Sequence, residues 1–581
     1  MRIVDARVAT GEHMRMPAGG WLLRSAGALT LALAACWPAA AHAQLSRELR
    51  TCATQTESLA AQRLAACNSV LNSGRLHGKP LGVVYALRGL AYLDRADLPH
   101  AIGDLNRAIE LAPDFAAAYQ NRGNAWYARG NYGEALADYE AAIKLDPGSS
   151  SPYVNRATVR RDLGYIEGAL EDYQKAIDLG ADRADIYRGR GQLYLRTRDY
   201  PKAIADFDRA LRLEPDTATY MLRAEARAGG GDVDGALDDY QEALRRDGKN
   251  VDAMTAIAGI WRKRGDLDKA IALYDRAIAA DQSRPTSYKL RAEAYAAQGH
   301  RQQAIADIGR AIKLTWTTDL VRLRATLRLQ GGDLDGALHD ADAILKADSQ
   351  NAGAYALRGA VFARKKDYVR ALPDLDKAIA VDEENALAYG ERAHIFIARH
   401  DSARALADLN RVIALAGSNP EYHLQRARIY KEKGEAAKAI ADLDAAIARD
   451  PRPAAPYVER ALLRKAEGRT DLALADLDRA LARAPDDTGA LNARAELRQA
   501  NGDTPGALAD YEAVVRRQPK NSSALQAHAA LLMQMIAAGA TARHRRRSVR
   551  AVRRACRCRT PSRAQARESG SRQPAPRGGA R

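Results

Sequence analysis

The strongest constraint on this chain is a repeat of about 34 residues that occurs thirteen times in tandem. One alanine of each repeat marks its register and recurs at steps of 34 residues, with two steps of 33: Ala101, Ala135, Ala169, Ala203, Ala236, Ala270, Ala304, Ala337, Ala371, Ala405, Ala439, Ala473 and Ala507. The repeats begin at residues 82, 116, 150, 184, 217, 251, 285, 318, 352, 386, 420, 454 and 488, and they fill residues 82–521. A segment of this length cannot bury a hydrophobic core alone and becomes stable only by stacking on its neighbours. We therefore expect one repetitive array in place of separate globular domains.

Each repeat has the pattern of two helices joined by a short turn. In residues 116–149, Tyr119, Gly123 and Trp126 recur at the spacing of one helix face, and the second half of the repeat shows the same spacing. Gly130 lies between the two halves, at a place where a helix commonly ends. The composition agrees, because only 6% of the residues are aromatic and only 21 are proline, whereas strong helix formers abound. The pattern predicts helix, turn and helix in every repeat.

This pattern resembles the tetratricopeptide (TPR) repeat. The likeness rests on the 34-residue step, on small residues at the eighth and twentieth positions, and on tyrosine at the fourth, and it covers about three quarters of the chain. The resemblance implies an all-α fold, an α-solenoid of about thirteen TPR helix–turn–helix repeats that form a superhelix. It also implies a non-enzymatic scaffold that binds a protein or peptide partner on the concave surface made by the first helices.

Two positions of the repeat vary together. The seventh position is arginine in twelve repeats: Arg88, Arg122, Arg156, Arg190, Arg223, Arg291, Arg324, Arg358, Arg392, Arg426, Arg460 and Arg494. The twenty-third position is aspartate in twelve: Asp104, Asp138, Asp172, Asp206, Asp239, Asp307, Asp340, Asp374, Asp408, Asp442, Asp476 and Asp510. The sixth repeat is the exception at both positions, with Ile257 and Leu273. We predict an Arg–Asp ion pair that joins the two helices of a repeat, or two neighbouring repeats, and an apolar contact in the sixth repeat.

The resemblance implies that the second, fifth, ninth and twelfth positions face the groove. The candidate groove residues are Gln120, Asn124 and Tyr127 in repeat two, Arg188 and Gln192 in repeat four, Lys289 and Glu293 in repeat seven, and Arg322 in repeat eight. Some TPR proteins hold a C-terminal carboxylate with lysine, asparagine and arginine at these positions, but consecutive repeats of this chain lack that set. Each residue alone is also compatible with a solvated helix face. The expected partner is a protein or peptide, and no small-molecule substrate is expected.

Motifs of catalysis are missing from the sequence. It contains no G-x-x-x-x-G-K-[ST], H-E-x-x-H or G-x-S-x-G motif. Residues 232–235 and 333–336 resemble the start of a calcium loop, but the repeat register places them in turns and the later glutamate is missing. The segments outside the array are too short to bury a core of their own. We therefore predict no enzyme, with no catalytic residue, no cofactor-binding residue and no metal site.

The first 43 residues have the features of a secretory signal peptide. Basic residues precede an apolar stretch from Ala26 to Trp37, and Ala-His-Ala stands before Gln44. The apolar stretch is too short for a membrane-spanning helix, which needs about 20 residues. A start at Met14 or Met16 would be more usual for such a signal, so residues 1–13 are a candidate start-site artefact. Cleavage after residue 43 would deliver a periplasmic or secreted protein.

A second interpretation of the same segment involves lipidation. Residues 33–36 read Leu-Ala-Ala-Cys, which resembles the lipobox of bacterial lipoproteins. Processing there would leave Cys36 as a lipidated N-terminus and the protein as an outer-membrane lipoprotein. The plainer alternative is that Cys36 is one apolar residue of the signal core.

Residues 44–81 are expected to form an N-terminal helical cap on the array. A helix is predicted from about Ser58 to Asn72, and it carries Cys67. Cys52 lies 15 residues earlier, and the repeats that follow contain no cysteine. In an exported protein this pair predicts a disulfide between Cys52 and Cys67, with a redox or metal role as the alternative.

The chain changes character after the last repeat. Residues 522–537 follow the pattern of a first helix without a second, and we expect a C-terminal capping helix. Residues 538–581 form a predicted disordered tail, in which residues 541–581 hold 14 arginines and one acid and so carry +13 of the net charge of +17. The tail is either an arm that binds nucleic acid or anionic membrane, or a reading-frame extension that is not native. It lacks aromatic residues for base stacking, and the nearly neutral array gives no reason to expect nucleic acid.

Overall fold

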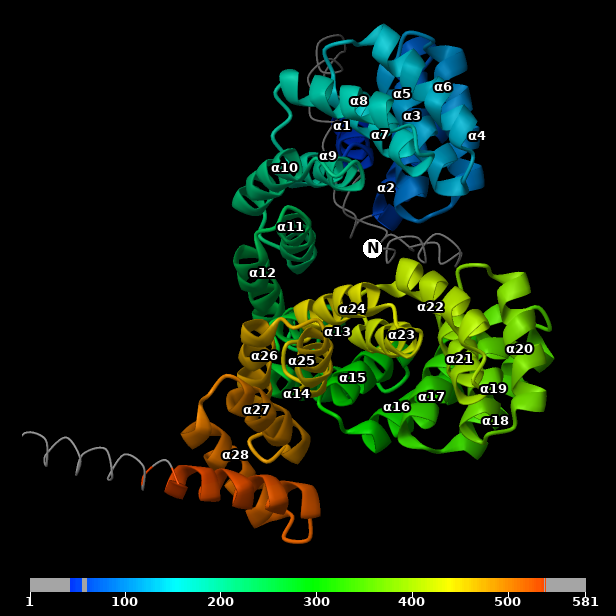
Figure 1. Cartoon of the computed structure of the whole chain (residues 1–581). Coiled ribbons are helices and arrows are strands. Elements are labelled where there is room, and N and C mark those ends of the chain that lie inside the picture. The colour runs from blue at the N-terminus through cyan, green and yellow to red at the C-terminus, as the bar shows by residue number, and fades with distance from the viewer. Residues whose placement is uncertain (1–41, 55–59, 538, 540–581) are drawn as a thin grey trace, which may run out of the picture. The chain divides into compact units, whose positions relative to one another are not determined.

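The computed structural model describes residues 42–54, 60–537 and 539, with the side chains from residue 47 onward (Figure 1). In these residues the chain is helical and forms no strand. It divides into two compact units, residues 1–316 and residues 317–581. The signal segment up to residue 41, Cys36 within it, and the arginine-rich tail from residue 540 lie outside the described residues. No helix in the described part of the chain has the length and apolarity needed to cross a membrane.

The N-terminal unit contains a cap and the first seven repeats. Its helices are α1 (His42–Cys52), α2 (Ala60–Asn72), α3 (Gly78–Asp94), α4 (Leu98–Leu111), α5 (Ala116–Arg129), α6 (Tyr132–Leu145), α7 (Ser150–Asp162), α8 (Ile166–Asp178), α9 (Ala184–Arg196), α10 (Tyr200–Leu213), α11 (Thr217–Gly229), α12 (Val233–Arg246), α13 (Val251–Lys263), α14 (Leu267–Ala280), α15 (Pro285–Ala297) and α16 (Arg301–Leu314).

The C-terminal unit contains the other six repeats and one further helix. Its helices are α17 (Thr318–Gly331), α18 (Leu334–Ala347), α19 (Ala352–Arg364), α20 (Tyr368–Val381), α21 (Ala386–Ala398), α22 (Ser402–Ala416), α23 (Pro420–Glu432), α24 (Ala436–Arg449), α25 (Ala455–Ala466), α26 (Thr470–Arg483), α27 (Thr488–Ala500) and α28 (Thr504–Arg517), followed by a helix over residues 522–537.

The helices follow the register of the sequence repeat. From repeat two onward each first helix begins within one residue of the expected start, and only α3 begins earlier, at Gly78 instead of residue 82. Within each unit a first helix packs on the second helix of its own repeat, and that helix packs on the first helix of the next. The predicted all-α solenoid of helix–turn–helix repeats is therefore confirmed.

Close helix packing depends on the two small positions. The register alanines are at most 1% exposed, so they lie at the helix–helix contact. A Cβ atom added to Gly123 would lie 2.7 Å from Cε1 of Tyr139, which is closer than real Cβ contacts allow. The eighth position must therefore be small wherever an aromatic ring of the second helix reaches across to it.

The turn between the two helices requires a left-handed backbone at the fifteenth position. Gly130 has a φ of 86° there. In four repeats a residue with a side chain takes this conformation, with φ between 56° and 61°: Ala96, Arg198, Lys366 and His400. Because side chains of L-residues crowd the backbone in this region, these four turns are strained.

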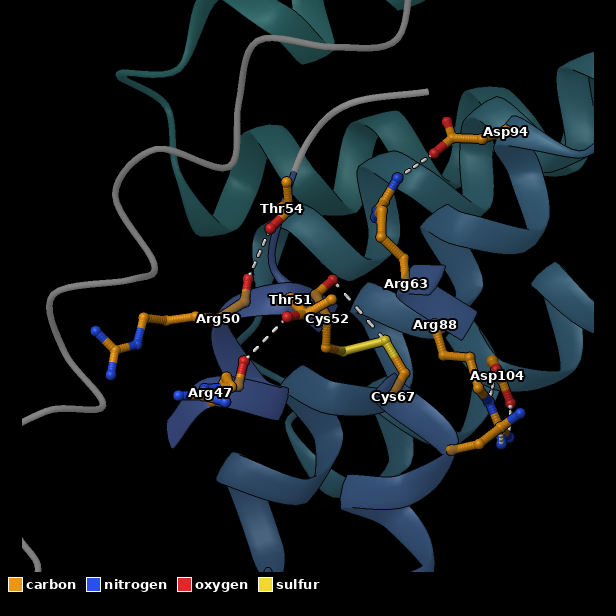
Figure 2. Close-up of a disulfide and its surroundings, with 11 residues drawn as sticks. Arg47, Arg50, Thr51, Cys52, Thr54, Arg63, Cys67, Arg88, Asp94 and Asp104 are labelled. Atoms are coloured by element: carbon orange, nitrogen blue, oxygen red, sulfur yellow. Dashed lines mark hydrogen bonds and ion pairs between the residues drawn. A yellow bond between two sulfur atoms is a disulfide. The ribbon is translucent and has the colours of Figure 1, made fainter. Parts of the chain in front are cut away.

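The N-terminal cap is a pair of helices joined by a disulfide. Cys52 at the end of α1 and Cys67 in α2 form the bond, and both are 0% exposed (Figure 2). Helix α2 begins at Ala60, and residues 55–59 are not described. Arg88 of repeat one donates a 2.7 Å hydrogen bond to Asn68 of α2. The cap thus packs on the array with a polar contact of the kind that joins the repeats.

Candidate protein-binding surface

The paired arginines and aspartates form a ladder inside the array, which we call the Arg–Asp ladder. In each of the twelve repeats, Nε and Nη2 of the arginine donate to the two carboxylate oxygens of the aspartate at 2.6–3.0 Å. The aspartates are at most 8% exposed. In repeat six, Ile257 and Leu273 pack in one apolar cluster. The predicted pairing and its apolar replacement are both present.

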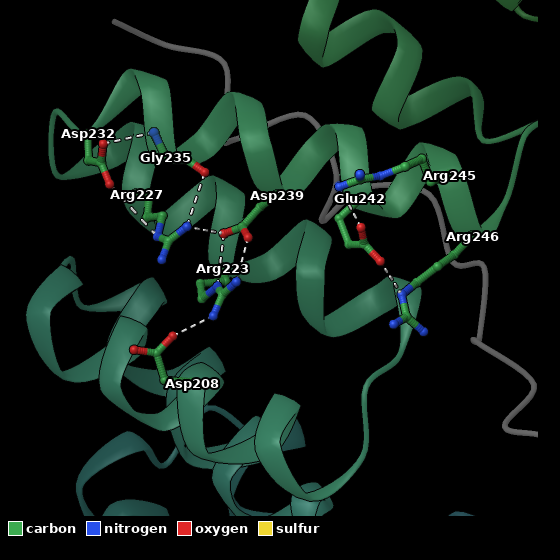
Figure 3. A network of polar contacts seen from close by, with 9 residues as sticks. All are labelled: Asp208, Arg223, Arg227, Asp232, Gly235, Asp239, Glu242, Arg245 and Arg246. Atoms are coloured by element: carbon green, nitrogen blue, oxygen red, sulfur yellow. Dashed lines mark hydrogen bonds and ion pairs between the residues drawn. The ribbon is translucent and has the colours of Figure 1, made fainter.

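A third contact of the ladder joins neighbouring repeats. The remaining nitrogen, Nη1, donates to the twenty-fifth residue of the preceding repeat in most repeats, and Figure 3 shows Arg223 between Asp239 and Asp208. The acceptors are Asn106, Gln174, Asp208, Asp275, Asp342, Asp376, Asn410, Asp444 and Asp478, at 2.5–2.9 Å. Each such arginine therefore joins the two helices of its own repeat and connects them to the preceding repeat. Hydrogen bonding to Asp138 raises the pKa of Arg122 above its ordinary value, although burial opposes the shift.

Sequence reasoning missed a second arginine in the ladder. The eleventh position is aromatic in most repeats, but in five it is an arginine whose Nη1 donates to the ladder aspartate at 2.8–2.9 Å: Arg160, Arg227, Arg328, Arg464 and Arg498. The aspartate then holds two guanidinium groups, as Arg223 and Arg227 show in Figure 3. The alternation between an aromatic residue and arginine at this position was the sequence signal. These largely buried, paired charges have a structural role in the ladder.

Two of the expected groove residues are buried. Gln120 and Asn124 are each 8% exposed. Oδ1 of Asn124 accepts hydrogen bonds from the Tyr139 hydroxyl at 2.9 Å and from Nδ2 of Asn155 at 2.8 Å. The expectation that these two side chains face an open groove is wrong, because both are buried.

Other expected groove residues pair with neighbours. The Tyr127 hydroxyl donates to Asp162 of the next repeat at 2.6 Å, and burial, together with this bond, raises the pKa of Tyr127. Glu293 forms an ion pair with Arg262 of the preceding repeat at 3.1 Å. The first helices thus carry pairs that cross from one repeat to the next.

The remaining candidates differ in accessibility. Nη2 of Arg188 lies 3.4 Å from Oδ2 of Asp216. The side chains of Gln192 and Lys289 are half-buried. Arg322 is exposed and pairs with Asp319 on the same helix at 2.7 Å. Repeat four supplies Arg188 and Gln192, repeat seven supplies Lys289 and repeat eight supplies Arg322.

A cleft of about 320 Å³ lies elsewhere on the first helices, between α21 and α23. Its lining comes from repeats ten and eleven: His394, Ile397, His400, Ser402, Glu421, Gln425, Arg428, Ile429 and Glu432. His394 and Ile397 occupy the ninth and twelfth positions of one repeat, and Glu421 and Arg428 the second and ninth of the next. The positions expected to line a groove therefore do so here, in repeats from which sequence analysis named no residue.

The polar side chains that line the cleft differ in whether a neighbouring residue neutralises their charge. Nε2 of Gln425 lies 2.8 Å from Nε2 of His394 and 3.2 Å from a carboxylate oxygen of Glu421. Arg428 is held from outside the cleft by Glu459, at 2.9 Å. Its charge is thereby neutralised, whereas Glu421 and Glu432 leave the cleft with an acidic character. Among the described residues no group of three or more histidine, cysteine, aspartate or glutamate side chains is placed to hold a metal ion.

Stacked helix pairs with a cleft on their first helices define an α-solenoid of helix–turn–helix repeats. Sequence profiles of the tetratricopeptide repeat match residues 116–149, 154–218, 221–285, 322–386, 391–456 and 458–525. Because these matches cover more than half of the chain, the protein belongs to the tetratricopeptide repeat family. No curated protein sequence matches it.

Solved structures of the same family are similar to parts of the chain. The TPR protein YrrB, described as having an unusual peptide-binding site, is 23% identical over 31% of this chain and 92% of its own, with a TM-score of 0.29. Yeast Tom70 is 18% identical over 78% of this chain and 96% of its own, with a TM-score of 0.31. A chain of the APC/C hetero-tetramer Cut9–Hcn1 is 14% identical over 78% of this chain and 96% of its own, with a TM-score of 0.34.

Proposed function

We propose that this protein is a non-enzymatic scaffold that holds a protein or peptide partner on the surface of its first helices. Tetratricopeptide repeat proteins generally mediate protein–protein interactions. The observation that carries the proposal is the cleft between α21 and α23, because four of its lining residues stand at positions expected to face a groove. A cleft of about 320 Å³ has room for one or two side chains of an extended segment.

The chemistry of the cleft indicates the kind of side chain it holds. Ile397 and Ile429 supply apolar walls, and Glu421 and Glu432 supply negative charge. A lysine or arginine fits this lining, since its methylene stem packs on apolar surface while its charged end reaches a carboxylate. The proposed partner therefore presents a basic side chain in an extended segment.

We place this binding in the bacterial periplasm or envelope. Disulfides persist in oxidising compartments and are rare in the cytosol, and the buried Cys52–Cys67 bond fits the former. The signal-like sequence of residues 1–43 supports the same location. N-terminal sequencing of the mature protein tests it, because export with cleavage gives Gln44 or a lipidated Cys36, and an unprocessed cytosolic chain overturns it.

Photocrosslinking from the cleft tests the binding proposal. A photoreactive amino acid replaces Ile397 in the full chain, and the matched control carries it at Val369, which is 79% exposed on α20 and outside the cleft. We expect a specific crosslinked partner from position 397 and none from 369. Glu421→Lys together with Glu432→Lys should abolish the crosslink. A crosslink that survives this charge reversal contradicts the proposal, and one lost on deletion of residues 541–581 transfers binding to the tail.

A further inference from the structure

The helix over residues 522–537, which follows α28 in Figure 1, buries only one of its faces. Ala524 and Leu531 are 2% and 1% exposed and belong to a hydrophobic cluster that repeats twelve and thirteen share. On another face, Leu525 and Leu532 are 39% and 38% exposed, and Ile536 is 70% exposed. The last helix therefore ends the array with an open apolar stripe.

The repeat register identifies what this stripe is built to contact. Counted from residue 522, Leu525, Ala529 and Leu532 stand at the fourth, eighth and eleventh positions, and Ile536 follows one turn later. In complete repeats the eighth position faces the repeat's own second helix, as the close approach of Gly191 to the ring of Phe207 shows. Ala529 keeps this position small although nothing covers it. The face is that of a first helix, and within the described residues no second helix follows it.

We propose that this face accepts an amphipathic helix of a partner protein, which docks as the missing second helix of a fourteenth repeat. The thirteen complete repeats give the pattern that such a helix must carry. Their second helices have alanine at the twentieth position, an apolar residue at the twenty-fourth, and alanine, valine or isoleucine at the twenty-seventh. The docked helix continues the helix–helix contact already present in every repeat.

Repeat six is the best template for the incoming helix. His528 stands where the ladder arginine would be, so the partner helix needs no aspartate at the twenty-third position. Repeat six lacks the ladder in the same way and uses Leu273 of α14. An apolar residue there matches the surface of the last helix better than a charge, because an aspartate would lack the guanidinium that holds both of its oxygens in the other repeats.

Other occupants fit the face less well. The chain's own continuation would place Thr541, Arg545 and Ser548 at the three pattern positions, which removes the apolar contact. In a second copy, the second helices in the described residues are already covered by their own repeats. A lipid surface would favour basic residues on the helix, and residues 522–537 contain no lysine or arginine.

The test uses a peptide of known sequence on the full chain. A fluorescent peptide with the sequence of residues 266–281, which spans α14, is titrated with the protein and its anisotropy is followed. We expect saturable binding that Leu532→Glu weakens by at least about tenfold. Ala529→Leu should weaken it similarly, because a bulky side chain prevents close helix approach, although it changes only an exposed residue. Gln526→Glu, on the exposed surface away from the stripe, is the matched control and should leave binding unchanged.

Each alternative gives a distinct result that overturns the proposal. Absence of saturable binding, or full binding by Ala529→Leu, removes the helix-docking site. A dimer in sedimentation that Leu532→Glu dissociates assigns the face to a second copy. Binding to anionic phosphatidylserine vesicles that Leu532→Glu abolishes and Ala529→Leu strengthens assigns it to lipid, since added apolar surface favours insertion.

Discussion

The coupling between Arg122 and Asp138 is the sharpest test of the structural argument. Two charge-assisted hydrogen bonds of 2.9 and 2.7 Å join them, and their side chains are only 22% and 7% exposed. Removing one member leaves the other charge desolvated and unpaired, which typically costs 3–5 kcal/mol when the pair is buried. Because Arg122 keeps some exposure and its bond to Asn106, we expect about 2 kcal/mol for Asp138→Leu. For Arg122→Ile, which strands the more buried carboxylate, we expect about 3 kcal/mol.

The double variant should cost less than the two single variants together. Arg122→Ile with Asp138→Leu reproduces the apolar pair that repeat six already uses at Ile257 and Leu273. We expect about 2 kcal/mol for the double variant, and hence a coupling free energy of about 3 kcal/mol. The intact pair thus adds only about 2 kcal/mol to the free energy of unfolding relative to the apolar pair. Loss of either member alone is costly because the other charge is left buried without its partner.

The measurement must resolve a single repeat, because long arrays do not unfold in one step. Hydrogen exchange followed by mass spectrometry on peptides from α5 and α6 reports the local free energy of opening. The control pair is Arg107 and Glu110, which lie 2.7 Å apart with more than half of each side chain exposed. There we expect a coupling of about 0.3 kcal/mol. If the Arg122 and Asp138 variants add within about 0.5 kcal/mol, the ladder does not have the role given to it here.

Three further perturbations have defined outcomes. Lys366→Gly should stabilise repeat nine by about 1 kcal/mol, because it relieves a φ of 59°, and urea denaturation monitored by local exchange will show it. Cys52→Ser with Cys67→Ser should lower the opening free energy of α1 and α2 by about 3 kcal/mol without affecting later repeats, as exchange mapping can establish. Burial raises the pKa of Tyr240 to about 12, against about 10 in an unfolded chain, so the folded state binds the proton more tightly and loses about 2–3 kcal/mol of stability as the pH rises from 10 to 12. Tyr240→Phe should remove that loss, of which about 1.4 kcal/mol is present at pH 11, when denaturation curves at pH 8 and pH 11 are compared.

The sequence predicted the fold well because the repeat supplies many independent copies of the same constraint. The thirteen register alanines gave the start of every repeat, and the helix boundaries follow from it. The sixth repeat lacks both the arginine and the aspartate, with Ile257 and Leu273 in their places, and this joint change indicated that the two residues pair in the other repeats. Helix α3 begins four residues early because it packs on the cap, and the cap does not follow the repeat. Where the local pattern repeats, one sequence carries the information that an alignment would otherwise provide.

The candidate site was predicted less well, because it depends on pairs of residues from neighbouring repeats. Position within a repeat indicates that a side chain lies on the first-helix surface, but not whether the next repeat covers it. Asn124 is buried because Asn155 of the next repeat and Tyr139 of its own bind it. His394 has the same ninth position, yet it lines a cleft. The difference depends on the side chain one repeat away, which no single-repeat pattern contains.

This dependence suggests how such an array can specialise a binding surface without losing its fold. The ladder arginine uses its Nε and Nη2 on its own repeat and, in most repeats, its Nη1 on the preceding one, so the seventh, twenty-third and twenty-fifth positions are committed to stacking. The second, ninth and twelfth positions carry no part of that network and are free to differ between repeats. In some repeats the side chains at these positions form ion pairs with the neighbouring repeat, as Glu293 does with Arg262. Their charges are then neutralised within the protein and do not attract a partner. Where they leave carboxylates beside apolar side chains, as at Glu421 and Ile397, the surface offers a site to a partner. Substitutions that change recognition should therefore cluster at these three positions and leave stability nearly unchanged, whereas substitutions in the ladder should do the reverse.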